Sequence, residues 1–216
     1  MRPAIQRKCD WLFRMRRTSE PILVVPDTPI LPFMHAQRNT GVICLAAKDG
    51  LIQGSMDHGV EHSLGFVNHW AVCGLREAAY AAHELSHAED AVRFEQEACD
   101  LRAALKTFMQ GTPSFFEHER TANSLLWPTR AWEDSPELVE AGFNAWWASN
   151  RGEAYKPEPY WLYFEFAQAH NALLLGQPEK AWRSVQYRLQ HQDVPGLYGY
   201  REGGDGIGTE NALHCE

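Results

Sequence analysis

Apolar residues recur every three or four positions over six stretches of the chain, which is the spacing of one face of an α-helix. In the first stretch, Ile5, Cys9 and Leu12 share a face, and basic residues occupy much of the remainder. The same pattern predicts helices over residues 4–17, 63–85, 89–109, 135–149, 160–175 and 179–190. We therefore predict an all-α protein.

Proline and glycine separate these helices. Prolines crowd residues 21–32, which excludes a helix there and predicts an extended passage. Residues 41–46 fit either a strand or a turn of helix, and residues 49–54 have turn chemistry. Six glycines make residues 196–208 a loop, and a short helix is expected to begin at Thr209 or Asn211. The pattern contains no convincing sheet.

One short pattern occurs twice, at an offset of 90 residues and without a gap. Residues 79–91 and 169–181 share Ala, Ala, Leu, Glu and Ala at matching positions, and Ser86 falls on Gly176. In both copies a helix ends, a turn follows, and a second helix opens with an acidic residue where the helix dipole favours it. The repeat predicts an antiparallel αα-hairpin that is used at least twice.

Length and composition fit one globular domain over residues 1–216, with 44% apolar and 22% charged residues. A net charge of −8 argues against sequence-independent binding of nucleic acid. No apolar run is long enough for a membrane span, and no signal-peptide pattern follows the basic N-terminus. The five cysteines form no CxxC pair, so we expect free thiols and a cytoplasmic location.

The segment from His83 to His87 matches the HExxH motif, in which two histidines one helical turn apart bind zinc and the glutamate serves as the base. The repeat, however, places His87 in the turn between two helices, so the two rings need not share a helical face. No third ligand follows in a recognisable pattern. We therefore expect no metal, and the sequence indicates no cofactor.

These hairpins, together with the loops before them, resemble the six-hairpin glycosidase superfamily of (α/α) toroid enzymes. Residues 49–59 are similar to the loop that these enzymes place before an inner helix. Residues 66–91 and 166–182 resemble an inner helix, a turn and an outer helix, and residues 196–203 resemble the loop before a later hairpin. A complete toroid needs roughly twelve helices, so the chain is expected to be a fragment, an open partial toroid or one chain of an assembly that completes the ring. A partial ring exposes an apolar flank, which favours a homo-oligomer.

In such toroids the loops that enter the inner helices line one mouth, and the resemblance implies that acidic residues there do the chemistry. Glycoside hydrolysis needs one carboxylic acid to assist the leaving oxygen and one carboxylate to activate water or attack the anomeric carbon. We expect Asp57, Glu133 and Glu202 to supply these groups. Each of these acids also has a structural interpretation. Asp57 would be a turn or cap residue, Glu133 would complement the dipole of the next helix, and Glu202 would be a polar loop residue.

Aromatic side chains near these acids suit a saccharide, because the CH groups of a pyranose ring pack against an aromatic face. Aromatic residues make up 12% of the chain, and many lie beside Pro, Gly or acidic residues. The expected carbohydrate-binding residues are His58, Glu61, Trp127, Trp132, Tyr160, Trp161, Tyr198, Tyr200 and Asp205. Each aromatic otherwise packs in the core or between hairpins.

Two other functions fit the same sequence. A sugar epimerase or polysaccharide lyase on this fold would transfer protons with His or Tyr, for which His58, His62 and His69 are candidates. A non-catalytic, tetratricopeptide-like α-solenoid would bind a protein partner, although the repeat offset is too long for a unit of about 34 residues. The long aromatic loops favour the toroid, so the preferred prediction is a glycoside hydrolase-like enzyme.

Overall fold

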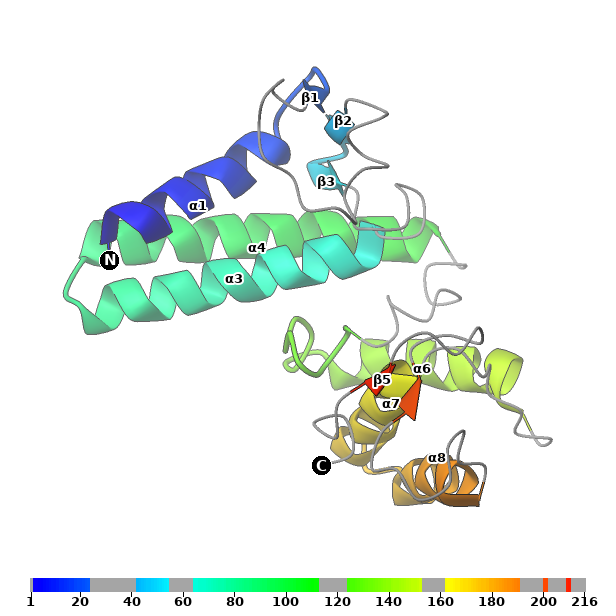
Figure 1. Cartoon of the computed structure of the whole chain (residues 1–216). Helices are drawn as coiled ribbons and strands as arrows, with labels where there is room; N and C mark the ends of the chain where they lie inside the picture. The colour runs from blue at the N-terminus through cyan, green and yellow to red at the C-terminus, as the bar shows by residue number, and fades with distance from the viewer. Residues whose placement is uncertain are drawn as a thin grey trace. The chain divides into compact units, whose positions relative to one another are not determined.

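The computed structural model describes residues 2–23, 42–54, 64–112, 124–152, 162–190, 200–201 and 209–210 (Figure 1). The chain divides into two compact units, residues 1–124 (unit 1) and 125–216 (unit 2). The described residues are mainly helical, as predicted: α1 (Arg2–Met15), α3 (Leu64–Glu84), α4 (Ala88–Gly111), α6 (Pro136–Asn150), α7 (Leu162–Leu174) and α8 (Pro178–Gln190). A single hairpin domain over residues 1–216 stays a prediction.

Unit 1 is built on the antiparallel pair of α3 and α4, along which α1 lies (Figure 1). Its core includes the predicted apolar positions Leu75, Leu101 and Leu105, together with Val72 and Phe94. The predicted positions Trp70, Leu85 and Val92 are exposed instead. Helix α1 adds Cys9 and Phe13, and the ring of Phe13 lies 6.2 Å from that of Phe94. Three helices therefore share one core.

Polar contacts fix the C-terminal end of α1. The buried guanidinium of Arg16 donates to the Gly50 carbonyl oxygen at 3.1 Å and to the Glu97 carboxylate at 2.8 Å. Arg17 pairs with the same carboxylate. Because Gly50 belongs to a β-turn and Glu97 to α4, these bonds tie α1 to both elements.

A small antiparallel sheet covers this end of unit 1, with strands β1 (Ile22–Leu23), β2 (Val42–Lys48) and β3 (Leu51–Gly54) in that order. Asp49 and Gly50, with φ of 55° and 74°, form the turn between β2 and β3. Positive φ at both central residues is typical of a two-residue hairpin turn, and Asp-Gly is among its preferred sequences. The prediction that the chain contains no sheet is therefore wrong.

The side chain of Asn68 on α3 holds strand β3 from its free edge. Its Oδ1 accepts from the Ile52 amide at 3.0 Å, and its Nδ2 donates to the carbonyl oxygens of Ile52 at 3.0 Å and Leu64 at 2.8 Å. The amide thus pairs with the strand as a neighbouring strand would, which satisfies buried backbone groups. Ile52 and Leu64 stand on either side of residues 55–63 in the sequence.

The two copies of the predicted repeat have the same turn. Both contain the same two hydrogen bonds: His87 N to Ala82 O (2.8 Å) and Ser86 N to His83 O (2.9 Å), then Gln177 N to Ala172 O (2.8 Å) and Gly176 N to Leu173 O (3.0 Å). In each copy, a left-handed residue and the residue after it donate the two bonds, which is the Schellman motif that ends a helix. The predicted αα-hairpins are confirmed for α3–α4 and for α7–α8.

Unit 2 buries the aromatic side chains of α6 at its core. Phe143 and Trp146 are the most enclosed, with ring centroids 6.0 Å apart. Lys180 of α8 lies over the rings of Phe143 and Trp147 at 5.3 Å and 5.5 Å, and its ammonium donates to Asn144 Oδ1 at 2.5 Å. Burial lowers the pKa of Lys180. These contacts join α8 to α6.

A second small sheet pairs β4 (Tyr200–Arg201) with β5 (Thr209–Glu210) in antiparallel register. The sequence predicts a loop over residues 196–208 and a helix that begins at Thr209 or Asn211. A strand at Thr209 replaces the predicted helix start there, and Asn211 lies outside the described residues. Glycine-rich sequence between two short extended segments is typical of a hairpin connection.

None of the helices in the described ranges has the length and apolar content that a crossing of the membrane requires.

Candidate functional site

Most of the predicted catalytic and binding residues lie outside the described part of the chain. These residues are Asp57, His58, Glu61, Tyr160, Trp161, Tyr198, Glu202 and Asp205, together with His62. Tyr200 is described only through the backbone of β4. The remaining three, Trp127, Trp132 and Glu133, all belong to residues 125–135, which precede α6. We call this segment the aromatic loop, and it is the part of the candidate site that has a described geometry.

Buried apolar side chains hold the aromatic loop in place. Leu125, Leu126, Ala131 and Trp132 are all buried, and Ser135 with Pro136 begins α6 as the sequence predicts. Trp132 is only 1% exposed, so its ring belongs to the core and presents no face to a substrate. The sequence allowed Trp132 either to bind a sugar or to pack in the core, and the structure supports packing.

Trp127 has the opposite environment, since it is 43% exposed. Its ring lies against the imidazole of His170 on α7, with centroids 4.8 Å apart. Its backbone N–H donates to Oδ1 of the buried Asn171 at 2.9 Å. Helix α7 therefore fixes both the backbone and the ring of Trp127. An aromatic surface that is exposed and already ordered loses little conformational entropy when a ligand packs on it.

Glu133 is exposed and paired within the aromatic loop. Nε of Arg130 donates to Oε2 of Glu133 at 2.6 Å, and Arg130 adopts a left-handed backbone with φ of 53°. A guanidinium at this distance favours the ionised form of a carboxyl group. Glu133 in this geometry suits the role of a base or a nucleophile, and a general acid would have to come from another carboxyl group.

A buried polar network joins the three helices of unit 2. Nη2 of Arg151, which follows α6, donates to Oε2 of Glu165 on α7 at 2.5 Å, and Ser184 Oγ on α8 donates to Oε1 at 2.7 Å. The Arg151 guanidinium also lies 4.7 Å from the centre of the Trp146 ring. All of these side chains are buried, so the network fixes the relative positions of α6, α7 and α8.

The network continues along one face of α7, where Glu165, Gln168 and Asn171 follow one another at three-residue steps and are all buried. Neither amide atom of Gln168 has a hydrogen-bond partner among the residues that the structure describes. The residues predicted for the site were carboxylates in loops, so this helical stripe was not among them. The available signal was its spacing, because Ala169 and Ala172 lie beside the same polar positions and mark an inward face.

His69 does not reach a surface where it could act on a sugar. Its ring is fully buried in unit 1, and Nδ1 lies 2.7 Å from Oγ of Ser124. Burial lowers the pKa of His69 to about 3, so the ring is neutral near pH 7. This geometry removes His69 from the proton-transfer candidates and makes it a structural residue that joins α3 to Ser124.

The HExxH segment adopts the arrangement that the repeat predicts. Helix α3 ends at Glu84, and His87 immediately precedes α4. The two histidines therefore do not share one helix. Among the residues that the structure describes, no group of three or more His, Cys, Asp or Glu side chains is arranged to hold a metal ion.

No protein-family model, curated protein or solved structure matches this chain. The functional proposals below therefore rest on its residues and on the resemblance stated above.

Proposed function

We propose that the protein is a carbohydrate-active, glycoside hydrolase-like enzyme that cleaves a glycosidic bond with two loop carboxylates. The proposal rests on one surface of unit 2. There, the exposed ring of Trp127 lies against His170, and the Arg130–Glu133 pair belongs to the same loop as Trp127. An exposed aromatic ring with polar groups in the same loop suits a saccharide, whose CH face packs while its hydroxyls form hydrogen bonds.

Glu133 takes the role of the ionised carboxylate in this proposal, because Arg130 donates to it. The second carboxyl group, which protonates the leaving oxygen, comes from Glu202, which belongs to unit 2 together with Glu133. Retaining hydrolysis places the two groups about 5 Å apart, whereas inverting hydrolysis leaves a water between them at about 6.5–9.5 Å.

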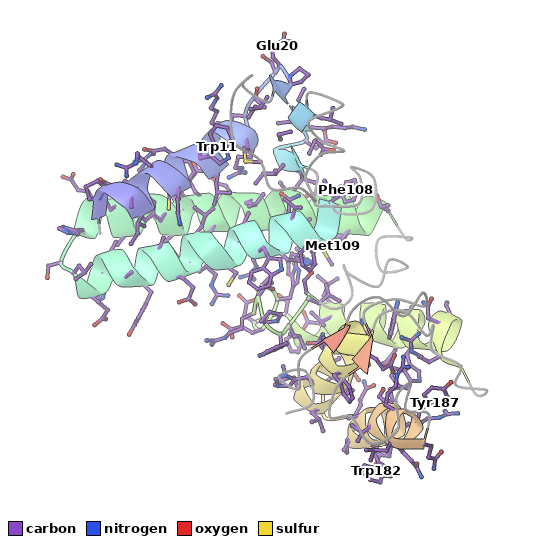
Figure 2. The ribbon with its side chains drawn as sticks, viewed as in Figure 1. Trp11, Glu20, Phe108, Met109, Trp182 and Tyr187 are labelled. Atoms are coloured by element: carbon purple, nitrogen blue, oxygen red, sulfur yellow. The ribbon has the colours of Figure 1, made fainter. Side chains whose placement is uncertain are left out.

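We also propose the partial toroid, with α3–α4 and α7–α8 as two of its hairpins. The identical turns at an offset of 90 residues support this architecture. Val92 on α4 and Trp182 on α8 occupy equivalent positions in the repeat and are 71% and 60% exposed (Trp182 is labelled in Figure 2). Exposed apolar side chains at corresponding positions of the two hairpins fit an incomplete ring, which would assemble as a homo-oligomer.

The test is turnover and binding of a panel of mono- and oligosaccharides by the full chain and its variants. Glu133→Gln and Glu202→Gln should each lower kcat by about 100-fold or more if the carboxyl group reacts, while calorimetric binding persists. Trp127→Ala should weaken binding. Glu137→Gln, on the exposed first turn of α6, is the matched control. Full turnover by Glu133→Gln would exclude its assigned role.

The exposed Val92 and Trp182 also fit the second candidate, a non-catalytic α-solenoid that binds a protein partner. A folded sample that shows no thermal or calorimetric response to any sugar would favour this scaffold. Proton exchange at a sugar carbon, without cleavage of a glycosidic bond, would instead favour an epimerase.

A further inference from the structure

The N-terminal segment that contains helix α1 is basic, whereas the rest of the chain is acidic. The first 17 residues contain six of the 20 Lys and Arg residues but only one of the 28 Asp and Glu residues. The remainder of the chain is therefore strongly acidic, although the net charge of the whole is only −8. Such an asymmetry marks α1 as the part of the molecule that attracts anions.

The five basic residues from Arg7 to Arg17 fall into two groups. Arg16 and Arg17, at the end of the helix, are already paired with Glu97. Arg7, Lys8 and Arg14 are exposed, and no ion pair joins them to another side chain in the described ranges. Because these three charges are exposed and form no ion pair in the described part of the chain, they are available to an anionic ligand.

These three cations share a helical face with an exposed tryptophan. Arg7, Trp11 and Arg14 follow one another at steps of four and three residues, and Lys8 lies beside them. Trp11 is 38% exposed and lies 5.4 Å from the guanidinium of Arg14 (Figure 2). From Arg7 to Arg14 the face runs about 10 Å along the helix axis. We call it the cationic face of α1.

The opposite face of α1 is occupied, because Cys9 and Phe13 are buried against the core of unit 1. An amphipathic helix that binds a lipid surface inserts its apolar face, and here that face is not available for insertion. A broad anionic surface, such as a bilayer or a nucleic-acid duplex, would also approach the acidic remainder of the chain. A narrow anionic polymer contacts one helix face and avoids that repulsion.

We propose that the cationic face of α1 binds an acidic polysaccharide, with carboxylate groups at Arg7, Lys8 and Arg14 and a sugar ring packed on Trp11. The inference rests on the proposed function, to which it adds the class of substrate. Charge complementarity explains the cations, and the CH face of a sugar explains an exposed aromatic side chain between them. The face holds the polymer on unit 1.

The test is calorimetric titration of the full chain with polygalacturonate, with neutral dextran as the uncharged comparison. Polygalacturonate should bind and dextran should not, and added salt should weaken binding because polyanion binding releases counterions. Arg7→Gln combined with Arg14→Gln should weaken binding about tenfold or more. Lys48→Gln combined with Lys106→Gln removes the same charge from exposed sites elsewhere and should leave the affinity within about twofold.

Trp11 is tested separately from the charges. Trp11→Ala should weaken polygalacturonate binding, whereas Trp182→Ala removes an exposed tryptophan from α8 and should not. Tighter binding of polyuridylic acid or of phosphatidylserine vesicles through Arg7 and Arg14 would overturn the proposal, because another anion would then be the ligand. Unchanged affinity in the Arg7 and Arg14 double variant would overturn it as well.

The same measurements separate this inference from the proposed function. Hydrolysis of neutral oligosaccharides without any binding of polygalacturonate would overturn the inference and leave the enzyme proposal in place. Polygalacturonate binding through α1 without turnover of any sugar would support the inference and count against catalysis.

Discussion

Ser86 and Gly176 occupy the same position in the two hairpins, and both adopt a left-handed backbone, with φ of 60° and 69°. Glycine adopts this conformation without steric cost, whereas a residue with a Cβ atom is strained there. The two hairpins therefore use one turn geometry, and only the second has the residue that suits it best.

The first prediction is that Ser86→Gly stabilises the protein by about 0.5–1 kcal/mol, because it relieves the strain at the α3–α4 turn. Gly176→Ser should lower the free energy of unfolding by a similar amount. Urea unfolding followed by circular dichroism measures both changes. Changes of the same sign at the two positions would contradict the equivalence of the turns.

The second prediction concerns the buried pair of Arg151 and Glu165. Glu165→Ala should lower the free energy of unfolding by about 3–5 kcal/mol, because it leaves a guanidinium without its buried counter-charge. Arg151→Ala should be comparably severe. The control is Glu133→Ala, which breaks the exposed pair with Arg130 and should cost less than about 1 kcal/mol. Equal losses at Glu165 and Glu133 would contradict the assignment of the network.

The third prediction is local to strand β3. Asn68→Ala removes three hydrogen bonds, of which two are to Ile52, and should cost about 2–3 kcal/mol in the free energy of unfolding. Hydrogen exchange should show a loss of protection at the Ile52 amide, while the amides in the middle of α4 remain protected. Retained protection at Ile52 would show that β3 does not depend on this side chain.

The fourth prediction is a dependence of stability on pH. Burial lowers the pKa of His69 to about 3, below the ordinary value of 6.5, so between these values the unfolded chain binds more protons than the folded protein. The contribution of His69 to the free energy of unfolding is therefore fully present above pH 6.5 and is lost as the pH decreases towards 3. At pH 5 the loss should be about 2 kcal/mol relative to pH 7.

Urea unfolding at pH 7 and pH 5 checks this prediction. The difference between the two pH values should shrink in His69→Gln, whatever the absolute stability of that variant. His83→Gln removes an exposed histidine of the same helix and should leave the difference unchanged. A full pH effect in His69→Gln would assign the acid sensitivity to other groups.

Apolar spacing was enough to predict the described helices, because each buries one face on a neighbouring element. Leu75, Leu101 and Phe143 are fully enclosed at the positions that this spacing predicts. The repeat also predicted the hairpin turns and the place of His87. The sheet was missed because β1 and β3 are short and because β2 is an almost continuous apolar run without alternation, even though Asp49-Gly50 had turn chemistry.

Less of the candidate site was predictable. Trp127 and Trp132 are only five positions apart in one loop, yet one is exposed and the other is core. Spacing within a loop has no fixed period, so the sequence does not separate the two cases. Glu165 was overlooked for a related reason, since a glutamate within a helix suggests a solvated face until its partner Arg151 is located in space.

The bonds of Asn68 to Ile52 and Leu64 have a consequence for protein engineering. Ile52, before residues 55–63, and Leu64, the first residue of α3 after them, are both hydrogen-bonded to this one side chain. A replacement of this segment by a peptide of another length or composition should leave the anchors in place. The scaffold is therefore a suitable host for grafted loops, with Asn68 as the residue that every chimera must retain.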